Sequence, residues 1–202
     1  MAENVGKRLE KKEPKKKKEK KPGRLTKGQK GLLAVDIVLA VVLVAVVFTF
    51  LARVITVDGR SMEPTYHNGD RVLVTNLAGA AQQGDVVIVV NALEEPIIKR
   101  VVATEGQTVD FDPVLGEVLV DGAALPGSVF GIEDGITFVP DVPGQVLEFP
   151  QTVPEGCVFV LGDNRGHSTD SRFQSVGMVD QRNILGKVVF NIYPFSNLGF
   201  VS

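Results

Sequence analysis

An unbroken apolar run near the N-terminus constrains this chain more than any other feature. Residues 32–52 read LLAVDIVLAVVLVAVVFTFLA, in which only Asp36 and Thr49 are polar. At about 1.5 Å per residue the run forms a helix of about 31 Å, which matches the hydrocarbon thickness of a bilayer. Asp36 lies about one turn from the basic end, where its carboxylate can reach the interface. The sequence therefore predicts one transmembrane helix over residues 31–52.

The charge of the chain divides at this helix. Residues 1–30 hold 13 of the 22 Lys and Arg residues and 4 of the 24 Asp and Glu residues, which gives +9. The remaining 9 basic and 20 acidic residues give −11. The basic segment has too few large apolar residues to bury a core, so we expect a disordered tail over residues 1–30. Basic residues before a span keep that end in the cytoplasm, which predicts a single-pass protein of the cell membrane with residues 53–202 on the extracytoplasmic side.

A cleavable secretory signal is the alternative interpretation of the same run. The basic segment before it is far longer than such signals carry, and Phe50-Leu51-Ala52 lacks a small residue three positions before a plausible cut. We therefore interpret the run as a retained anchor in the lipid bilayer.

Composition excludes several classes of site. A single cysteine, Cys157, rules out an intramolecular disulfide and a cysteine-rich zinc site. Two histidines, His67 and His167, leave little room for histidine-based metal chemistry, and we expect no metal and no cofactor. Because the segment after the helix is acidic, a nucleic-acid groove is not expected either.

After Arg53, short apolar runs separated by Gly, Pro, Asn and Asp replace the continuous apolarity. Such runs of Val, Ile and Phe are typical of strands, and Asp121-Gly122 and Asp134-Gly135 predict hairpin turns. We expect a mainly β domain, an antiparallel barrel or folded sheet, with an insertion over residues 107–155. The predicted strands are Arg71–Thr75, Val86–Val90, Pro96–Ala103, Glu117–Val120, Val146–Phe149, Val158–Leu161 and Leu185–Ile192.

A serine in a tight loop follows the helix. Gly59 and Pro64 bracket Ser61, and such a loop can hold a hydroxyl at a fixed angle with its backbone N–H turned toward a reacting oxygen. A serine in a Gly/Pro loop is also an ordinary turn residue. Catalysis by Ser61 would need a base, and the candidates are the two histidines, the two lysines that follow the basic tail, or a carboxylate.

Lys99 is the unusual candidate among these bases. It lies in the apolar run Pro96–Val102, and Lys187 is the other lysine beyond residue 30. A lysine in water titrates near 10.4, so a base at neutral pH needs a pKa lowered by roughly 2 to 3 units through desolvation. An Ile- and Val-rich strand can supply that environment, although a lysine on the outer face of a strand would be unremarkable.

A dense polar cluster follows the predicted strand that ends at Leu161. The segment GDNRGHSTDSR, residues 162–172, suggests a loop braced by its own ion pairs and side-chain hydrogen bonds. Ser168 or Ser171 could orient a lysine amine, and Asp170 with Arg172 could lock the loop.

Together, the anchor and the three clusters resemble the type I signal peptidase family. The resemblance is carried, in this order, by SMEPT (61–65), GDVVIV (84–89), KRVVATEG (99–106) and GDNRGHSTDSR (162–172). It implies a membrane-bound serine endopeptidase that removes N-terminal signal peptides from exported preproteins. The partners that it implies are preproteins, the lipid bilayer and the secretion translocon.

The resemblance also implies roles for single residues. Ser61 is expected to be the nucleophile and Lys99 the general base of a Ser–Lys dyad that forms an acyl-enzyme. Ser168 is expected to hydrogen-bond and orient the lysine amine. Four further positions are expected to shape the site through ion pairs: Asp163, Asp170, Arg172 and Arg100.

Gly59 departs from the pattern of some family members, which carry a serine two residues before the nucleophile to help stabilise the oxyanion. We therefore expect the oxyanion hole to use the Ser61 backbone N–H, with the Gly59 backbone or a water as second donor. Family members cut after small residues at the first and third positions before the scissile bond, an Ala-x-Ala pattern. The expected pocket walls are Ile55, Val57, Met62 and Ile98.

Three alternatives compete with this function, and one of them is not an enzyme. A Ser–His hydrolase would use His67 or His167, but it would not need Lys99-Arg100 inside an apolar strand. An inert membrane-tethered binding module would not need a serine and a lysine together in these motifs. A self-cleaving repressor with a Ser–Lys dyad is disfavoured by the anchor and by the lack of a helical DNA-binding region.

Overall fold

The structure, a computed structural model, describes residues 27–201. The predicted basic tail therefore lies almost entirely outside the described residues. The chain forms two compact units that divide between Val42 and Leu43.

Helix α1 (Lys27–Phe50) covers most of the predicted span. It begins before residue 31 because Lys and Gln are good helix formers, and it ends before residue 52 because Ala52 already belongs to a strand. Within α1, Gly28–Val46 has a mean hydropathy of 2.2 and is long and apolar enough to cross a membrane. The side chains of residues 28–46 are all exposed.

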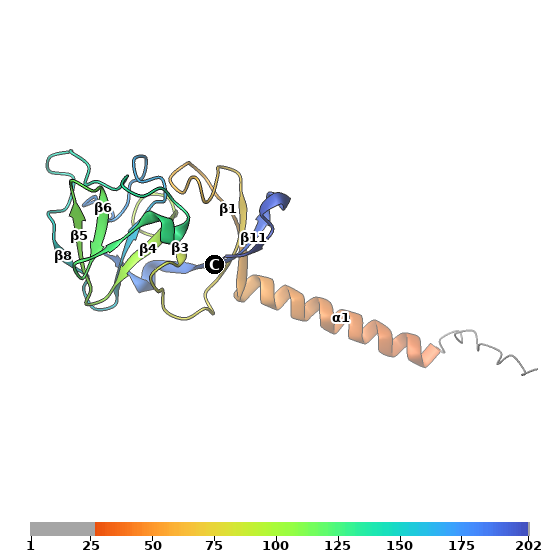
Figure 1. The fold of residues 1–202 in the computed structure, drawn as a ribbon. Coiled ribbons are helices and arrows are strands. Elements are labelled where there is room, and N and C mark those ends of the chain that lie inside the picture. The colour runs from red at the N-terminus through yellow and green to blue at the C-terminus, as the bar shows by residue number, and fades with distance from the viewer. Residues whose placement is uncertain (1–26, 202) are drawn as a thin grey trace, which may run out of the picture. The chain divides into compact units, whose positions relative to one another are not determined.

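An eight-stranded sheet dominates the rest of the chain and curls on itself (Figure 1). Its pairings are all antiparallel, which confirms the mainly β fold. Its path runs through β1 (Ala52–Thr56), β2 (Arg71–Thr75), β11 (Ile184–Tyr193), β3 (Val86–Val89), β4 (Ile97–Thr104), β9 (Cys157–Leu161) and β10 (Val179–Asp180), and β12 (Gly199–Phe200) pairs with β11.

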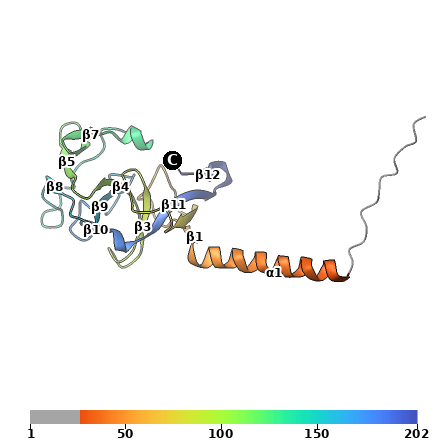
Figure 2. The same ribbon diagram turned by 90° about the horizontal axis from the view of Figure 1, so that it is seen from below.

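A four-stranded sheet forms within the predicted insertion. Figure 1 and Figure 2 both show β5 and β8 at the end of the domain away from β1. Its order is β7 (Ala123–Leu125), β6 (Glu117–Val120), β5 (Thr108–Asp112) and β8 (Gln151–Thr152). Short 3-10 helices lie at η1 (Gly127–Phe130), η2 (Gln181–Asn183) and η3 (Phe195–Asn197).

The central strand β3 is buried on both faces, which explains its continuous apolar sequence. Val86 and Ile88 pack into one core cluster, together with Val57 and Met62 from the loop that carries Ser61. Val87 and Val89 pack into a second cluster on the opposite side of the strand. The Ser61 loop is therefore anchored in the main core.

Two sequence predictions in the insertion are wrong. Val146–Phe149 is not a strand, because only Val146 forms a bridge, to Phe173, and a proline follows at position 150. Asp134-Gly135 is a turn but closes no hairpin, since the chain after it bonds elsewhere: the Thr137 N–H donates to Gly116 O. Asp121-Gly122 does connect β6 to β7 as predicted.

Candidate active site

The loop between β1 and β2 holds Ser61 in a fixed frame. Val57 N donates to Asp70 O over 2.8 Å, and Gly69 N donates back to Val57 O over 2.9 Å, which closes the base of the loop. The Met62 side chain is buried directly after Ser61. Ser61 itself is half-buried, so its hydroxyl is both positioned and reachable.

Lys99 lies on β4 and points its amine at this hydroxyl. Its Nζ is 2.8 Å from Ser61 Oγ and donates to Ile98 O over 2.8 Å. Only 2% of the residue is exposed. Burial lowers the pKa of Lys99 to about 8, against the weaker opposing effect of Asp170 and Asp163. About a tenth of such an amine is neutral at pH 7, and a neutral amine can accept a proton.

The expected ion-pair residues form two buried pairs beside Ser61 and Lys99. The Arg100 guanidinium donates to both carboxylate oxygens of Asp163, over 2.8 and 2.7 Å. The Arg172 Nε donates to Asp170 Oδ1 over 2.8 Å. Because Arg100 follows Lys99 on β4, the first pair ties the 162–172 loop to the strand that carries the amine.

Ser168 does not bond to Lys99 in this structure. Its side chain is buried, and its Oγ has no hydrogen-bond partner among the described residues. Gly162 packs against it so closely that a Cβ there would lie 2.5 Å from Ser168 Cβ and from Ser61 O. Ser168 therefore lies at the site, but the Lys99 amine bonds to Ile98 O and Ser61 Oγ instead.

The two expected oxyanion donors differ in availability. Gly59 has a positive φ of 87°, and its N–H donates to Asn68 Oδ1 over 3.0 Å. In this structure the Gly59 N–H is therefore engaged by Asn68. Within residues 27–201 the Ser61 N–H makes no backbone hydrogen bond, and it remains free to donate to a reacting oxygen.

An apolar cavity of about 470 Å³ adjoins the start of the Ser61 loop. Three of the expected pocket walls, Ile55, Val57 and Ile98, line it together with Pro96 and Leu185. Met62 does not line it, since its side chain points into the main core. Of the four expected pocket walls, Met62 alone is therefore absent from the lining of this cavity.

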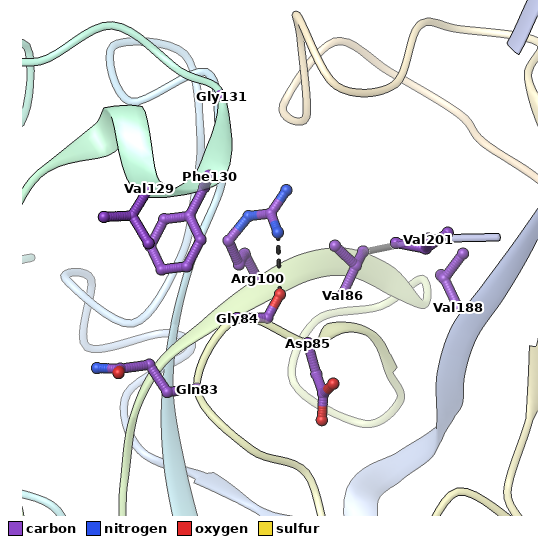
Figure 3. Close-up of a pocket in the computed structure, with 10 residues that line it drawn as sticks. All are labelled: Gln83, Gly84, Asp85, Val86, Arg100, Val129, Phe130, Gly131, Val188 and Val201. Carbon is purple, nitrogen blue, oxygen red and sulfur yellow. Dashed lines mark hydrogen bonds between the residues drawn. The ribbon is translucent and has the colours of Figure 1, made fainter.

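A second cavity of about 460 Å³ holds Arg100 but neither Ser61 nor Lys99. Figure 3 shows Arg100 donating to Gly84 O, beside the ring of Phe130 from η1. The Arg100 Cζ lies 5.0 Å from the centre of that ring, a distance at which a cation and an aromatic face attract. The insertion thus packs against the ion pair that supports β4.

Several residues that sequence reasoning did not select complete the site. Asn164 N donates to Ser61 O over 3.0 Å, and Asn164 Nδ2 donates to Arg60 O over 3.1 Å. Arg165 donates to Gly162 O and to Thr137 Oγ1, over 3.1 and 2.6 Å. Asn164 and Arg165 lie in the polar segment 162–172, but their bonds to Arg60 and Thr137 join distant parts of the chain, and no sequence pattern indicates such bonds.

The two histidines are exposed and bond elsewhere. His67 contributes its backbone N–H to Asp70 Oδ2, and His167 Nδ1 lies 3.2 Å from Asn164 Oδ1. Among the described residues, no group of three or more His, Cys, Asp or Glu side chains could hold a metal ion.

Comparisons with known proteins point to one family. A family model described as signal peptidase, peptidase S26, matches residues 32–193. Signal peptidase I of Mycobacterium tuberculosis (strain H37Rv) is 34% identical, over 83% of this chain and 74% of the relative. Signal peptidase I S of Bacillus subtilis (strain 168) is 32% identical, over 80% and 88%. A crystal structure of a signal peptidase I from Enterococcus faecalis V583 aligns with a TM-score of 0.39 at 24% identity, over 53% of this chain and 95% of that one.

Proposed function

Because the chain belongs to the signal peptidase family, peptidase S26, we propose that it removes N-terminal signal peptides from exported preproteins as a membrane-bound serine endopeptidase with a Ser61–Lys99 dyad. One observation carries the dyad: a lysine amine with little exposure lies 2.8 Å from a serine hydroxyl. Burial lowers the pKa of Lys99 to about 8, so desolvation supports its use as a base.

Acylation begins when Ser61 Oγ attacks the scissile carbonyl carbon and its proton passes to Lys99 Nζ. The tetrahedral intermediate collapses with cleavage of the C–N bond, and the Lys99 ammonium donates its proton to the leaving amine. The mature protein leaves with a new N-terminus, and the signal peptide stays as an ester on Ser61.

Deacylation uses the same amine. A water gives its proton to neutral Lys99 as its oxygen attacks the ester carbonyl, and the ester bond breaks to release the signal peptide. The proton returns from Nζ to Ser61 Oγ. The Ser61 N–H stabilises the oxyanion in both steps, and a water is the second donor, since the Gly59 N–H bonds to Asn68.

The apolar cavity bounded by Ile55, Val57 and Ile98 is the proposed site for the substrate residues before the scissile bond. Two residues of its lining are close in sequence to the proposed dyad: Ile98 is directly before Lys99, and Asp58 is three residues before Ser61. An apolar wall suits the small side chains of an Ala-x-Ala site.

The membrane placement rests on α1 and on the charge around it. Its apolar stretch Gly28–Val46 can cross a bilayer, and the +9 charge of residues 1–30 favours a cytoplasmic N-terminus. The domain from residue 53 is then extracytoplasmic. There it meets preproteins at the bilayer surface, beside the secretion translocon.

The decisive experiment incubates the detergent-solubilised full chain with a preprotein that carries an Ala-x-Ala site. We expect one cut after the second Ala, read by product mass, and no cut by Ser61→Ala. An inert binding module predicts no cleavage by the intact chain, and a Ser–His hydrolase predicts that His67→Ala or His167→Ala abolishes it. Cleavage that persists in Ser61→Ala would reject the proposal.

A further inference from the structure

The peptide groups on both sides of Ser61 are held by one residue. We propose that Asn164 is a positioning residue that aims the Ser61 N–H at the oxyanion of the reaction. This inference rests on the proposed function, because it assumes that Ser61 forms a tetrahedral adduct. It assigns a role to Asn164 that the dyad does not require.

The first contact fixes the peptide group that contains the Ser61 N–H. The Arg60–Ser61 peptide is trans, so its C=O and N–H point in opposite directions. Asn164 Nδ2 donates to Arg60 O over 3.1 Å. Holding the carbonyl toward Asn164 therefore turns the Ser61 N–H away from Asn164.

The second contact fixes the following peptide group. Asn164 N donates to Ser61 O over 3.0 Å. The two peptide planes that flank Ser61 share its φ and ψ, so these two hydrogen bonds restrain both dihedral angles of the nucleophile. Rotation of either plane would break a bond to Asn164.

A hydrogen bond within the Ser61 loop cannot by itself fix the direction of the Ser61 N–H relative to β4. Glu63 N also donates to Arg60 O, over 3.2 Å, but Glu63 belongs to the same turn and moves with it. Asn164 follows Asp163, whose side chain is buried in its pair with Arg100. Asn164 therefore ties the direction of the Ser61 N–H to β4, the strand that also positions the Lys99 amine.

The aim of this N–H matters because the neighbouring donor is occupied. The Gly59 N–H donates to Asn68 Oδ1, which leaves the Ser61 N–H as the available backbone donor of the two that the sequence suggests. Loss of one oxyanion donor costs roughly 10²- to 10³-fold in rate. Loosening that donor, rather than removing it, should cost about 10- to 100-fold in kcat.

The test uses the full chain in detergent with two variants, Asn164→Asp and Asn164→Ala. The first keeps the shape but replaces the donor by a carboxylate oxygen, and the second removes the donor without adding charge. Both should lower kcat about 10- to 100-fold and leave KM within about twofold, since a transition-state interaction is lost. The matched control is Asn197→Asp, the same change at an exposed residue of η3, and it should behave as wild type.

A second measurement distinguishes a misdirected Ser61 N–H from a loss of folded protein. A peptide aldehyde forms a tetrahedral adduct with Ser61 Oγ, whereas an uncleavable peptide of the same sequence binds without one. The ratio of their affinities does not depend on the folded fraction, and it should fall in both variants by the factor lost from kcat. An unchanged ratio, or a rise in KM at constant kcat, would overturn the role of Asn164. Failure of the wild type to cleave would instead overturn the proposed function.

Discussion

The two strands that flank β3 each place a lysine opposite Val87, and the two lysines have different surroundings. Lys99 on β4 pairs with Val87 from one side, and Lys187 on β11 pairs with it from the other. Lys187 forms an ion pair with Asp85 over 2.7 Å. Within the described residues Lys99 forms no ion pair and bonds to Ile98 O and Ser61 Oγ. A buried lysine without a carboxylate partner is a candidate base, whereas its neighbour across one strand is a structural cation.

The largest expected effect separates these lysines by activity. Lys99→Ala should lower kcat/KM for preprotein cleavage by about 10³-fold or more, because the proposed proton acceptor is lost. Lys187→Ala should stay within about threefold, since its amine bonds to Asp85 rather than to Ser61. Equal losses in the two variants, with both chains folded by circular dichroism, would break the comparison.

The next effect is the pH dependence of the wild type. In the proposed mechanism Lys99 must be neutral to accept the Ser61 proton, and burial lowers its pKa to about 8. Activity should therefore rise with pH, and kcat/KM should increase about 50-fold between pH 6 and pH 8. The profile is measured with a pH-stable peptide substrate in detergent. A flat profile across this range would mean that another group takes the proton.

The smallest effect concerns stability. The folded-state pKa of Lys99 lies near 8, below its unfolded value of 10.5, so the unfolded chain binds more protons between these values. Burial of the Lys99 amine therefore lowers the free energy of unfolding by its full amount below pH 8, and this destabilisation disappears as the pH rises toward 10.5. Lys99→Met should therefore stabilise the protein by about 3 kcal/mol at pH 7, and by less at pH 10. Thermal unfolding at both pH values measures this, and equal gains at both would contradict the assignment.

Much of the fold follows from local sequence pattern. Arg71–Thr75 and Glu117–Val120 are strands with the predicted bounds, because their apolar residues alternate or run between turn residues. Ala52–Thr56 was missed, because its first residue ends the apolar run of the anchor and only Val54 and Ile55 of the other four are apolar. Its strand character comes from pairing with β2, which local sequence does not specify.

The candidate site was predictable in its residues more than in its bonds. The Ile- and Val-rich surroundings of Lys99 indicated a desolvated amine, and the lowered pKa is consistent with that environment. The lack of a hydrogen-bond partner for Ser168 Oγ within residues 27–201 and the two bonds from Asn164 to Arg60 O and Ser61 O were not predictable. Both depend on how the 162–172 loop meets residues about 100 positions away in the chain, and spacing carries no information about such contacts.

Two acceptors in the segment 107–155 receive hydrogen bonds from arginines of the 162–172 loop. These bonds limit which sequences can replace that segment. Phe138 O accepts from Arg172 Nη1 over 2.7 Å, and Thr137 Oγ1 accepts from Arg165 Nη1. A chimaera that grafts the corresponding segment of a relative must keep a carbonyl and a hydroxyl at these two places. Without them, two buried guanidinium groups would lose hydrogen-bond acceptors, at a cost of about 1 to 3 kcal/mol each. The segment 107–155 can therefore be replaced by that of a relative only if the hydrogen bonds at residues 137 and 138 are kept.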